Sequence, residues 1–335
     1  MIRDTFNRPL RDLRISVTDK CNFRCPYCMP AEIFGEKYEF LKREKLLTFE
    51  EITRLTRILV RLGAMKIRLT GGEPLVRREM EKLVGMLAAI DGVEDMAMTT
   101  NAVFLPEQAQ KLYDAGLKRI TISLDSLDEA VFQKMNGDRG TVEAVLRGLE
   151  AAERIGFSPI KINAVVQRGV NDHTLVDLAK FFKDRGHIVR FIEYMDVGNI
   201  NGWNMTDVVT AEEILQKIDA AMPLERIRPN YPGEVAQRYR YKDGAGEIGI
   251  IASVTKPFCG ACNRLRLSAE GSLYTCLFAT KGTDLRAPLR SSATDDEIEA
   301  MLRNMWEGRT DRYSEERSEL TGPRDDKIEM YHIGG

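Results

Sequence analysis

Residues 13–28 read LRISVTDKCNFRCPYC, a short run with β character followed by three cysteines in a C-x3-C-x2-C pattern. The run LRISVT alternates apolar and polar side chains with a period of two, which predicts a strand. Cys21, Cys25 and Cys28 then fall in the loop beyond the carboxyl end of this strand. In barrel-like α/β folds, that edge is where active sites assemble. The stretch therefore predicts an α/β fold whose first strand leads into a thiolate site.

The remaining cysteines form a second group. Cys259, Cys262 and Cys276 follow a C-x2-C-x13-C pattern, so all 6 cysteines lie in two triplets far apart in the sequence. Clustered thiolates favour soft-metal sites over core packing. Three protein ligands are one short of a closed tetrahedral site. An iron–sulfur cube held by three thiolates keeps one iron free, so two such cubes would give a reaction chamber with an open iron at each end.

Composition narrows the class of protein. The chain has 335 residues, of which 43% are hydrophobic and 30% are charged, yet its net charge is only −2. This balance argues against a non-specific nucleic-acid binder, which would carry a basic excess. No apolar run is long enough to cross a membrane, and residues 1–17 lack the apolar core of a secretory signal. We therefore expect a cytoplasmic protein with reduced cysteines, which weakens a disulfide interpretation.

Strand-like and helix-like runs alternate from residue 11 to about residue 195, which predicts a parallel sheet with right-handed crossovers. A capping box at Thr48–Glu51 opens the first of the helices. The expected strands cover 13–18, 65–70, 95–101, 119–125, 160–166 and 188–195.

After about residue 205 the pattern changes. A second capping box at Thr210–Glu213 opens one more helix, a hairpin is expected over 237–254, and another helix over 294–306. We therefore expect two domains, a partial barrel over 1–205 and a smaller iron–sulfur domain over 206–335.

The polar faces of the expected strands are unusual, because both faces of a parallel sheet are ordinarily apolar. Arg14, Arg68 and Lys161 each alternate with branched apolar side chains. A closed eight-stranded barrel has a solid apolar interior. Six strands with polar inner faces fit a partial (β/α)6 TIM-like barrel with a wet lumen better. The alternative is a sheet exposed on one face, but crossover helices normally cover both faces.

CNFRCPYC, followed by a strand that ends in GGEP at 71–74, resembles the radical S-adenosylmethionine (SAM) superfamily. The resemblance implies a [4Fe–4S] cluster on Cys21, Cys25 and Cys28, whose fourth iron is chelated by the amino and carboxylate groups of SAM. It also implies that the GGEP segment meets the methionine amino end. The SAM contacts that it assigns are Tyr27, Gly72, Ser123 and Met195.

The second triplet narrows the resemblance to one family. FCGACNRLRLSAEGSLYTCLF at 258–278, with the terminal Gly334-Gly335, is similar to the GTP 3′,8-cyclase family of molybdenum-cofactor biosynthesis. The similarity extends over essentially the whole chain, with Ser268 standing where threonine is more usual. It implies a second [4Fe–4S] cluster on the second triplet, whose open iron binds the guanine of GTP. In this family the Gly-Gly tail enters the active site, whereas without the resemblance it would be expected to fray.

The cations on the expected strands support a polyanionic substrate. Arg264 and Arg266 alternate with leucines, so both guanidinia leave the same side of a strand beside the second triplet. Several cations that converge on one cavity suit a triphosphate, whereas for any single one the alternative is an ion-paired surface charge. The resemblance implies catalytic roles for Arg14, Arg264 and Arg266. It assigns GTP contacts to Arg14, Lys66, Arg68, Thr99, Lys161, Arg190, Arg264, Leu265 and Arg266.

The resemblance further implies a reaction. SAM is cleaved reductively, the 5′-deoxyadenosyl radical abstracts the ribose H3′ of GTP, and the C3′ radical attacks guanine C8. Reduction of the resulting radical then gives (8S)-3′,8-cyclo-7,8-dihydroguanosine 5′-triphosphate. The implied partners are a flavodoxin- or ferredoxin-like electron donor, the downstream cyclic pyranopterin monophosphate synthase and a second copy in a homodimer, with no nucleic acid and no membrane.

Three alternatives stay open at this point. One is another radical SAM enzyme with an auxiliary cluster, such as a peptide-modifying enzyme, which needs no polyanion pocket. Another is a binding module whose cysteines hold zinc with a distant fourth ligand from His173, His187 or His332. The third is a structural or interaction protein, which would explain neither the open triplets nor the polar strand faces.

Overall fold

The computed structural model describes residues 1–317 and 327–334, and its strands form one sheet in the order β12-β11-β10-β1-β2-β3-β4-β5-β6-β9-β8-β7. The six strands expected from the sequence are present and occupy its centre, each parallel to its neighbour. They are β1 (Asp12–Ser16), β2 (Lys66–Thr70), β3 (Asp95–Thr100), β4 (Arg119–Ser123), β5 (Ile160–Val166) and β6 (Ile188–Glu193).

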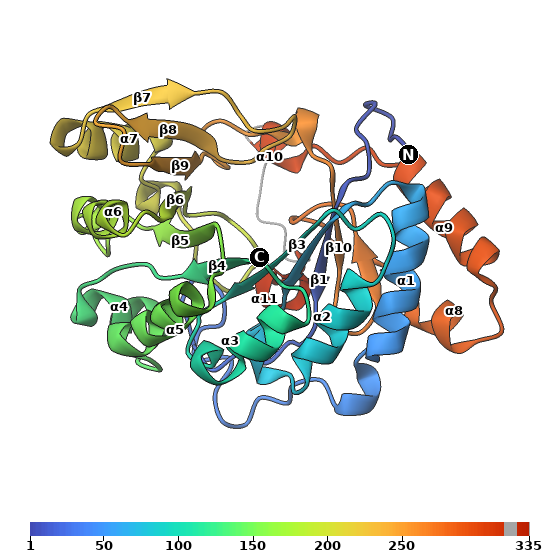
Figure 1. Cartoon of the computed structure of the whole chain (residues 1–335). Helices are drawn as coiled ribbons and strands as arrows, with labels where there is room; N and C mark the ends of the chain where they lie inside the picture. Colours follow the sequence, from blue (N-terminus) through green and yellow to red (C-terminus); the bar gives the residue numbers. More distant parts are fainter. Residues whose placement is uncertain (318–326, 335) are drawn as a thin grey trace.

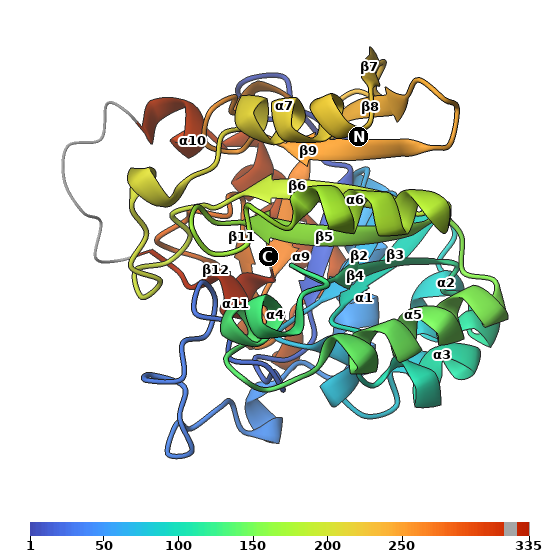
Figure 2. The ribbon, with the colours of Figure 1, turned by 90° about the vertical axis from the view of Figure 1, so that its left-hand side faces the viewer.

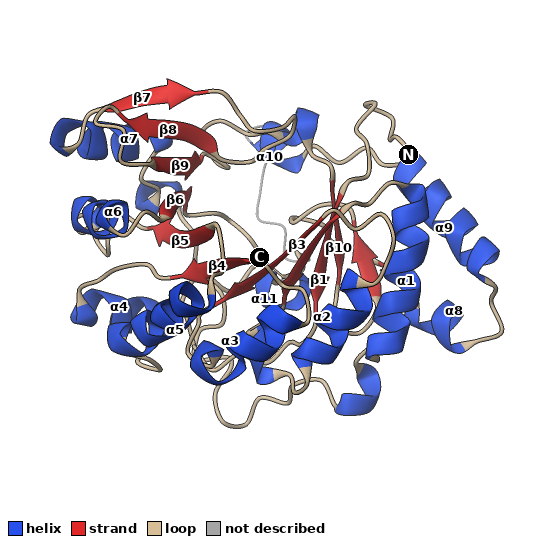
Figure 3. Cartoon of the chain, in the orientation of Figure 1, coloured by secondary structure: helices blue, strands red, loops and turns tan. Residues whose placement is uncertain are grey.

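Crossover helices lie on the outer side of the curved sheet, as Figures 1 and 3 show. Apolar residues that alternate with the polar ones, such as Leu13, Ile67 and Ile162, are fully buried in the core between strands and helices. This one-sided packing confirms the partial α/β barrel. The helices are α1 (Phe49–Leu62), α2 (Met80–Ala88), α3 (Leu105–Asp114), α4 (Glu129–Asn136), α5 (Val142–Ile155) and α6 (Leu175–Asp184).

Both capping boxes expected from the sequence are formed. The Thr48 side chain accepts a hydrogen bond from the Glu51 amide, and the Glu51 carboxylate accepts one from the Thr48 amide in return. Thr210 and Glu213 make the same reciprocal pair at the start of α7 (Ala211–Ala221). Each N-cap stabilises its helix by about 1 kcal/mol, because it satisfies amide groups that have no intrahelical partner.

Strands from the second part of the chain extend the sheet at both edges. β10 (Arg264–Leu267) pairs in parallel with β1, and β9 (Glu247–Ile251) pairs in parallel with β6. Antiparallel strands then complete the edges, and the expected hairpin is the β8–β9 pair. The sheet is therefore continuous across the expected boundary near residue 205, and the division into two domains stays a prediction. The outer strands are β7 (Leu224–Ile227), β8 (Gln237–Tyr241), β11 (Ser272–Tyr274) and β12 (Thr283–Asp284).

The remaining helices cover the sides of the barrel. α7 packs on α6 beside β6 and β9, as Figure 2 shows, and α9 packs on α1. α11 contacts β1 from inside the curve of the sheet, where Ile333 is fully buried. Within 1–317 and 327–334, no helix has both the length and the apolar character needed to span a bilayer. These helices are α8 (Arg286–Arg290), α9 (Asp295–Glu307), α10 (Tyr313–Glu316), α11 (Met330–Ile333) and the 3-10 turns η1 (Arg43–Lys45), η2 (Pro74–Val76), η3 (Met205–Asp207) and η4 (Cys259–Ala261).

The topology places the two cysteine triplets at opposite ends of the barrel. The first triplet follows β1, so it lies at the carboxyl edge of the parallel strands. Cys262 precedes β10, which is parallel to β1, and Cys276 follows β11, which is antiparallel to β10. Both therefore lie at the amino edge, and the lumen separates the two triplets.

Candidate functional site

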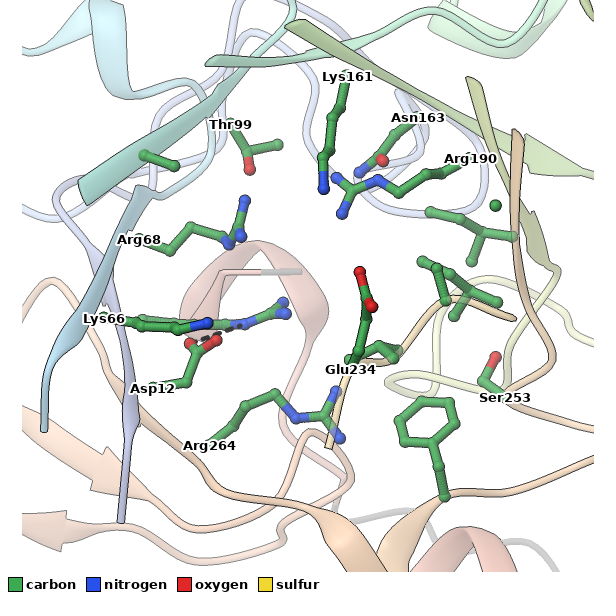
Figure 4. A pocket seen from close by; sticks show the side chains of 18 of the residues that line it. Asp12, Lys66, Arg68, Thr99, Lys161, Asn163, Arg190, Glu234, Ser253 and Arg264 are labelled. Carbon is green, nitrogen blue, oxygen red and sulfur yellow. Dashed lines mark ion pairs between the residues drawn. The ribbon is translucent and has the colours of Figure 1, made fainter. Parts of the chain in front are cut away.

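The polar lumen expected from the strand pattern is a cavity of about 1210 Å³ on the inner side of the sheet. Cationic side chains from separate strands point into it, as Figure 4 shows. Every residue for which a GTP contact was predicted lines it, except Leu265, whose side chain is fully buried in the hydrophobic core. The predicted residues that line it are Arg14, Lys66, Arg68, Thr99, Lys161, Arg190, Arg264 and Arg266.

Strand register explains why these cations meet. In β10, β1 and β2, Arg266, Arg14 and Arg68 are direct partners across neighbouring strands. Partners in register project their side chains from the same face, so three guanidinia stand in a row. Lys161 and Arg190 approach from the opposite arm of the sheet, on β5 and β6.

Few of these charges are neutralised by the protein. Among the described residues, carboxylates within ion-pair distance are found for Arg14 and for two residues not predicted from the sequence, Arg119 and Arg238. The Asp12 partner of Arg14 is distant, at 3.8 Å. Six other lining cations have no such carboxylate within the described ranges: Lys66, Arg68, Lys161, Arg190, Arg264 and Arg266.

Burial makes this excess of positive charge costly. It is the main cause that lowers the pKa of Lys161 to about 8 and the pKa of Arg190 to about 9, with neighbouring guanidinia adding to the shift. The Nε atoms of Arg14, Arg68 and Arg190 are buried without a hydrogen-bond partner in the part of the chain that the structure describes. Buried polar groups are nearly always satisfied, so these donors and charges together fit a bound polyanion.

Sequence reasoning missed several lining residues. Strand parity places Asn163 with Lys161 on the polar face of β5, but no substrate contact was predicted for it. Its buried Oδ1 has no partner among the described residues. Tyr231 and Glu234 come from the segment before β8, and the Lys66 Nζ lies 3.3 Å from the centre of the Tyr231 ring. No motif or periodicity in that segment indicates that it reaches the lumen.

A second cavity of about 510 Å³ surrounds the second triplet and is lined by Cys259, Cys262 and Cys276. It shares Arg264 and Met195 with the larger cavity, so the two cavities adjoin. This hollow, bounded by three cysteines and opening towards the cations, fits an iron–sulfur cube with one free corner.

The sulfur of Cys262 has an unusual set of donors. It accepts hydrogen bonds from Arg264 Nε at 3.3 Å, from Arg264 Nη2 at 3.1 Å and from Arg309 Nη2 at 3.3 Å. Burial alone would raise the pKa of Cys262, but the two guanidinia outweigh it and lower the pKa to about 6. The thiolate needed for metal ligation is therefore favoured at this position.

In the first triplet the pKa shifts have the opposite sign. Burial raises the pKa of Cys21 to about 12 and also raises the pKa of Cys25 and Cys28. Thiols in such a place ionise when a metal cation replaces their protons. The amide of Phe23 donates to Cys21 Sγ at 3.4 Å, and that of Phe278 donates to Cys276 Sγ at the same distance.

The spacing of these sulfurs bears on the zinc alternative. Within residues 1–317 and 327–334, no three His, Cys, Asp or Glu side chains are close enough together to hold a single metal ion. A cube places each thiolate on a different iron, so its ligands lie further apart than those of one ion. The placement of a cluster on each triplet stays a prediction.

The GGEP segment locks the loop that carries the first triplet. The Gly72 amide donates to Thr18 O at 2.7 Å, and a Cβ on Gly72 would lie 2.3 Å from Lys20 O. The buried Glu73 carboxylate accepts hydrogen bonds from the Thr100 hydroxyl at 2.6 Å and the Asn101 amide at 2.7 Å. The segment thus joins the loops after β1, β2 and β3.

The residues predicted to contact SAM are divided between two places. Met195 lines both cavities. Tyr27, Gly72 and Ser123 line neither but lie at the carboxyl edge near the first triplet, where the Tyr27 hydroxyl donates to Asp125 Oδ2 at 2.8 Å. The structure therefore brings three of the four to the end of the barrel that carries the first triplet.

The C-terminal tail reaches the row of arginines. Arg266 Nη1 donates a hydrogen bond to the carbonyl oxygen of Gly334. The preceding residues are anchored by hydrogen bonds from His332 to Glu270 at 2.8 Å and between the hydroxyls of Tyr331 and Tyr38 at 3.0 Å. Gly334 is therefore ordered against the cavity wall, whereas Gly335 lies outside the described residues.

Comparisons with known proteins agree with this arrangement. Residues 15–182 match the family described as the radical SAM superfamily, and residues 187–315 match the family described as Molybdenum Cofactor Synthesis C. Curated relatives named GTP 3′,8-cyclase are 51% identical in Acidothermus cellulolyticus and 49% identical in Xanthomonas axonopodis pv. citri, each covering 100% of this chain and 99% of the relative.

Solved structures add support for the fold. The crystal structure of Streptococcus suis SuiB bound to S-adenosylmethionine superimposes with a TM-score of 0.61 at 14% identity. The match covers 88% of this chain and 68% of SuiB. At that identity the likeness concerns the fold alone.

Proposed function

Because the chain belongs to the GTP 3′,8-cyclase family of the radical SAM superfamily, we infer that its lumen is where GTP is cyclised. The protein is a radical SAM enzyme of molybdenum-cofactor biosynthesis and converts GTP to (8S)-3′,8-cyclo-7,8-dihydroguanosine 5′-triphosphate. Its cofactors are SAM and [4Fe–4S] clusters.

We assign one cluster to Cys21, Cys25 and Cys28 and the other to Cys259, Cys262 and Cys276. The placement of the two triplets at opposite ends of the barrel and the cavity around the second triplet support this assignment, since SAM and GTP must meet between them. When bound, the first cluster supplies the electron that cleaves SAM and releases the 5′-deoxyadenosyl radical.

The observation that carries the substrate assignment is the set of half-buried cations in the lumen that have no carboxylate partner among the described residues. The triphosphate would accept hydrogen bonds from Lys66, Arg68, Lys161 and Arg190, which have no carboxylate partner among the described residues. The Nε atoms of Arg68 and Arg190 also lack any other hydrogen-bond partner there. The lumen then holds the ribose and the base in one orientation and keeps water away while a carbon radical exists. Another radical SAM enzyme without an anionic substrate would gain nothing from these cations.

Catalytic roles belong to Arg14, Arg264 and Arg266 in this proposal, because all three line the lumen and Arg264 and Arg266 also line the cavity of the second triplet. Thr99 and the backbone of Leu265 complete the GTP contacts. Tyr27, Gly72, Ser123 and Met195 contact SAM. Gly334 orients Arg266 through its carbonyl oxygen.

The partners of the enzyme follow from its chemistry. Reductive cleavage of SAM consumes an electron, and we propose that a flavodoxin- or ferredoxin-like protein supplies it. We propose that the product passes to cyclic pyranopterin monophosphate synthase, that the enzyme works in the cytoplasm and that it forms a homodimer.

The test is an anaerobic incubation of the full chain, reconstituted with iron and sulfide, with GTP, SAM and a reductant. We expect the 3′,8-cyclised nucleotide and 5′-deoxyadenosine in equal amounts. SAM cleavage without a change in GTP, together with the absence of GTP binding by calorimetry, would contradict the proposal and favour another radical SAM activity.

A further inference from the structure

A network of buried charges contacts the loop of the second triplet, and none of its residues lines the lumen. Arg8, Arg309 and Asp4 are 2%, 4% and 7% exposed. The Arg8 Nε donates to Asp4 Oδ2 at 2.5 Å, and Arg309 Nη1 lies 3.6 Å from the same oxygen. The Arg309 Nε also donates to Asp311 Oδ2 at 3.0 Å.

Both arginines also donate to the cysteine loop. Arg309 donates to the carbonyl oxygen of Cys262 at 2.9 Å and to its sulfur at 3.3 Å. Arg8 donates to the carbonyl oxygen of Cys259 at 2.9 Å. The network therefore fixes the backbone of two predicted ligands and the sulfur of one.

Stability alone does not account for this arrangement. Taking two guanidinia and a carboxylate out of water carries a large desolvation cost for each ion. Well-packed apolar residues in the same place often make a protein as stable or more stable. In addition, Arg309 directs an N–H group at a sulfur, which is a weaker acceptor than the carboxylates that are available elsewhere on the surface. The bond gains strength only when the sulfur is a thiolate.

Arg309 differs from Arg264, the other guanidinium on this sulfur. Arg264 lines the large cavity, where a nucleotide would compete for its donors. Arg309 lines only the cavity of the triplet, and the ring of Trp306 lies 4.8 Å from its guanidinium carbon. Its bond to Cys262 is therefore shielded from the substrate, so it persists whether or not the lumen is filled.

We propose that Arg309 is a positioning residue for the second cluster, which holds the Cys262 thiolate and stabilises the reduced state of the cluster through its charged hydrogen bond. The inference rests on the proposed placement of that cluster on the second triplet. Hydrogen bonds to the sulfurs and nearby charge set the reduction potentials of iron–sulfur clusters, and a cation stabilises the more negative, reduced form.

The test uses the full chain with Cys21, Cys25 and Cys28 replaced by serine, so that only the second cluster remains. In this parent protein, Arg309→Gln and Arg309→Lys are compared by anaerobic redox titration followed by electron paramagnetic resonance. We expect Arg309→Gln to shift the midpoint potential to a more negative value and Arg309→Lys, which keeps the charge, to shift it less. Arg303→Gln, on the exposed face of α9, serves as the matched control and leaves the potential unchanged.

The possible outcomes distinguish a wrong placement of the second cluster from a wrong role for Arg309. A parent protein that takes up no cluster would overturn the placement on the second triplet, and the inference with it. A parent that loads normally, with an unchanged potential in Arg309→Gln, would overturn the inference alone, even if the melting temperature falls. If Arg309→Gln fails to fold, Arg309→Lys decides: an unchanged potential and unchanged spectrum there count against the inference.

Discussion

Arg14 of β1 lies directly opposite Arg266 of β10, so two guanidinia from opposite ends of the chain stand side by side in the lumen. Arg68 continues the row on the other side of Arg14. Like charges directly opposite each other destabilise a sheet. Burial is the main cause that lowers the pKa of Arg14, to about 10, and of Arg266, and neighbouring arginines add to it. The row of arginines therefore destabilises the free protein, and a bound anion would offset this destabilisation.

Replacing Arg14 by glutamine tests this cost. We expect the melting temperature of the nucleotide-free, cluster-loaded protein to stay the same or rise, because one of the adjacent buried charges is removed. The affinity for GTP should fall by about 10- to 100-fold, the equivalent of a charged hydrogen bond. Anaerobic calorimetry and thermal denaturation with and without GTP measure both effects.

Arg240→Gln is the control for this experiment, since Arg240 is an exposed arginine on β8 that pairs with Glu225. Neither its GTP affinity nor the stabilisation by GTP should change. A clear loss of stability in Arg14→Gln with unaltered GTP affinity would mean that the row serves the fold and not the substrate.

Gly72 is the second test position. An alanine Cβ there would lie 2.3 Å from Lys20 O and 2.6 Å from Lys20 C, so the loop that carries the first triplet must move. We expect Gly72→Ala to lose the first cluster while it keeps the second, which iron and sulfide analysis would show as half of the normal content. SAM cleavage should be lost with it.

Gly85→Ala provides the comparison, because Gly85 lies within α2 and an added Cβ meets nothing within 4 Å. Alanine favours a helix over glycine by about 1 kcal/mol, so this variant should be slightly more stable and fully loaded with iron. Normal iron content in Gly72→Ala would show that the cysteine loop tolerates the displacement.

Local pattern explains which parts of this structure the sequence could predict. The period of two around Arg14 and Lys161 predicted a polar lumen, because strand side chains alternate regardless of what lies across the sheet. The same rule could not show that β10 pairs with β1, since four residues of RLRL do not specify a partner strand. That pairing is tertiary, and it is what joins Arg266 to Arg14.

Other site residues could not be predicted from the sequence, because tertiary contacts bring them to the site. Tyr231 enters the lumen from an irregular segment, and Arg8 and Arg309 approach the second triplet from the two ends of the chain. No spacing rule links such positions. Leu265 shows the opposite kind of error. The resemblance predicted that it contacts GTP, but its side chain is buried in the core.

Cys276→Ser tests the second cluster directly. Without this thiolate the second triplet keeps two ligands, so we expect the iron content of one cluster, continued SAM cleavage and no cyclised nucleotide. The physical reason is that the base loses its anchor while the radical source at the other end is untouched. Chromatography of 5′-deoxyadenosine and of the nucleotides separates the two activities. Cyclised product at the wild-type rate would refute a substrate-binding role for this cluster.

Lys161 gives the enzyme a predictable pH dependence. Burial, followed by the charge of Arg190, lowers the pKa of Lys161 to about 8 in the free protein. A triphosphate beside the ammonium group would raise that pKa, so GTP binding favours the protonated form. The affinity is therefore full below pH 8 and declines above it, by up to about tenfold per pH unit while one proton must be taken up on binding.

Calorimetric titration of GTP at about pH 7 to 9 checks this sign, and the phosphate itself does not interfere because its last ionisation lies near pH 6. Lys161→Arg is the decisive comparison, since an arginine keeps its proton to a higher pH than a lysine in the same place. We expect its dissociation constant to stay level where that of the wild type rises. An equal rise of the dissociation constant in both proteins would mean that a group other than Lys161 causes the pH dependence. A wild-type constant that does not change with pH would show that the Lys161 ammonium does not meet the triphosphate.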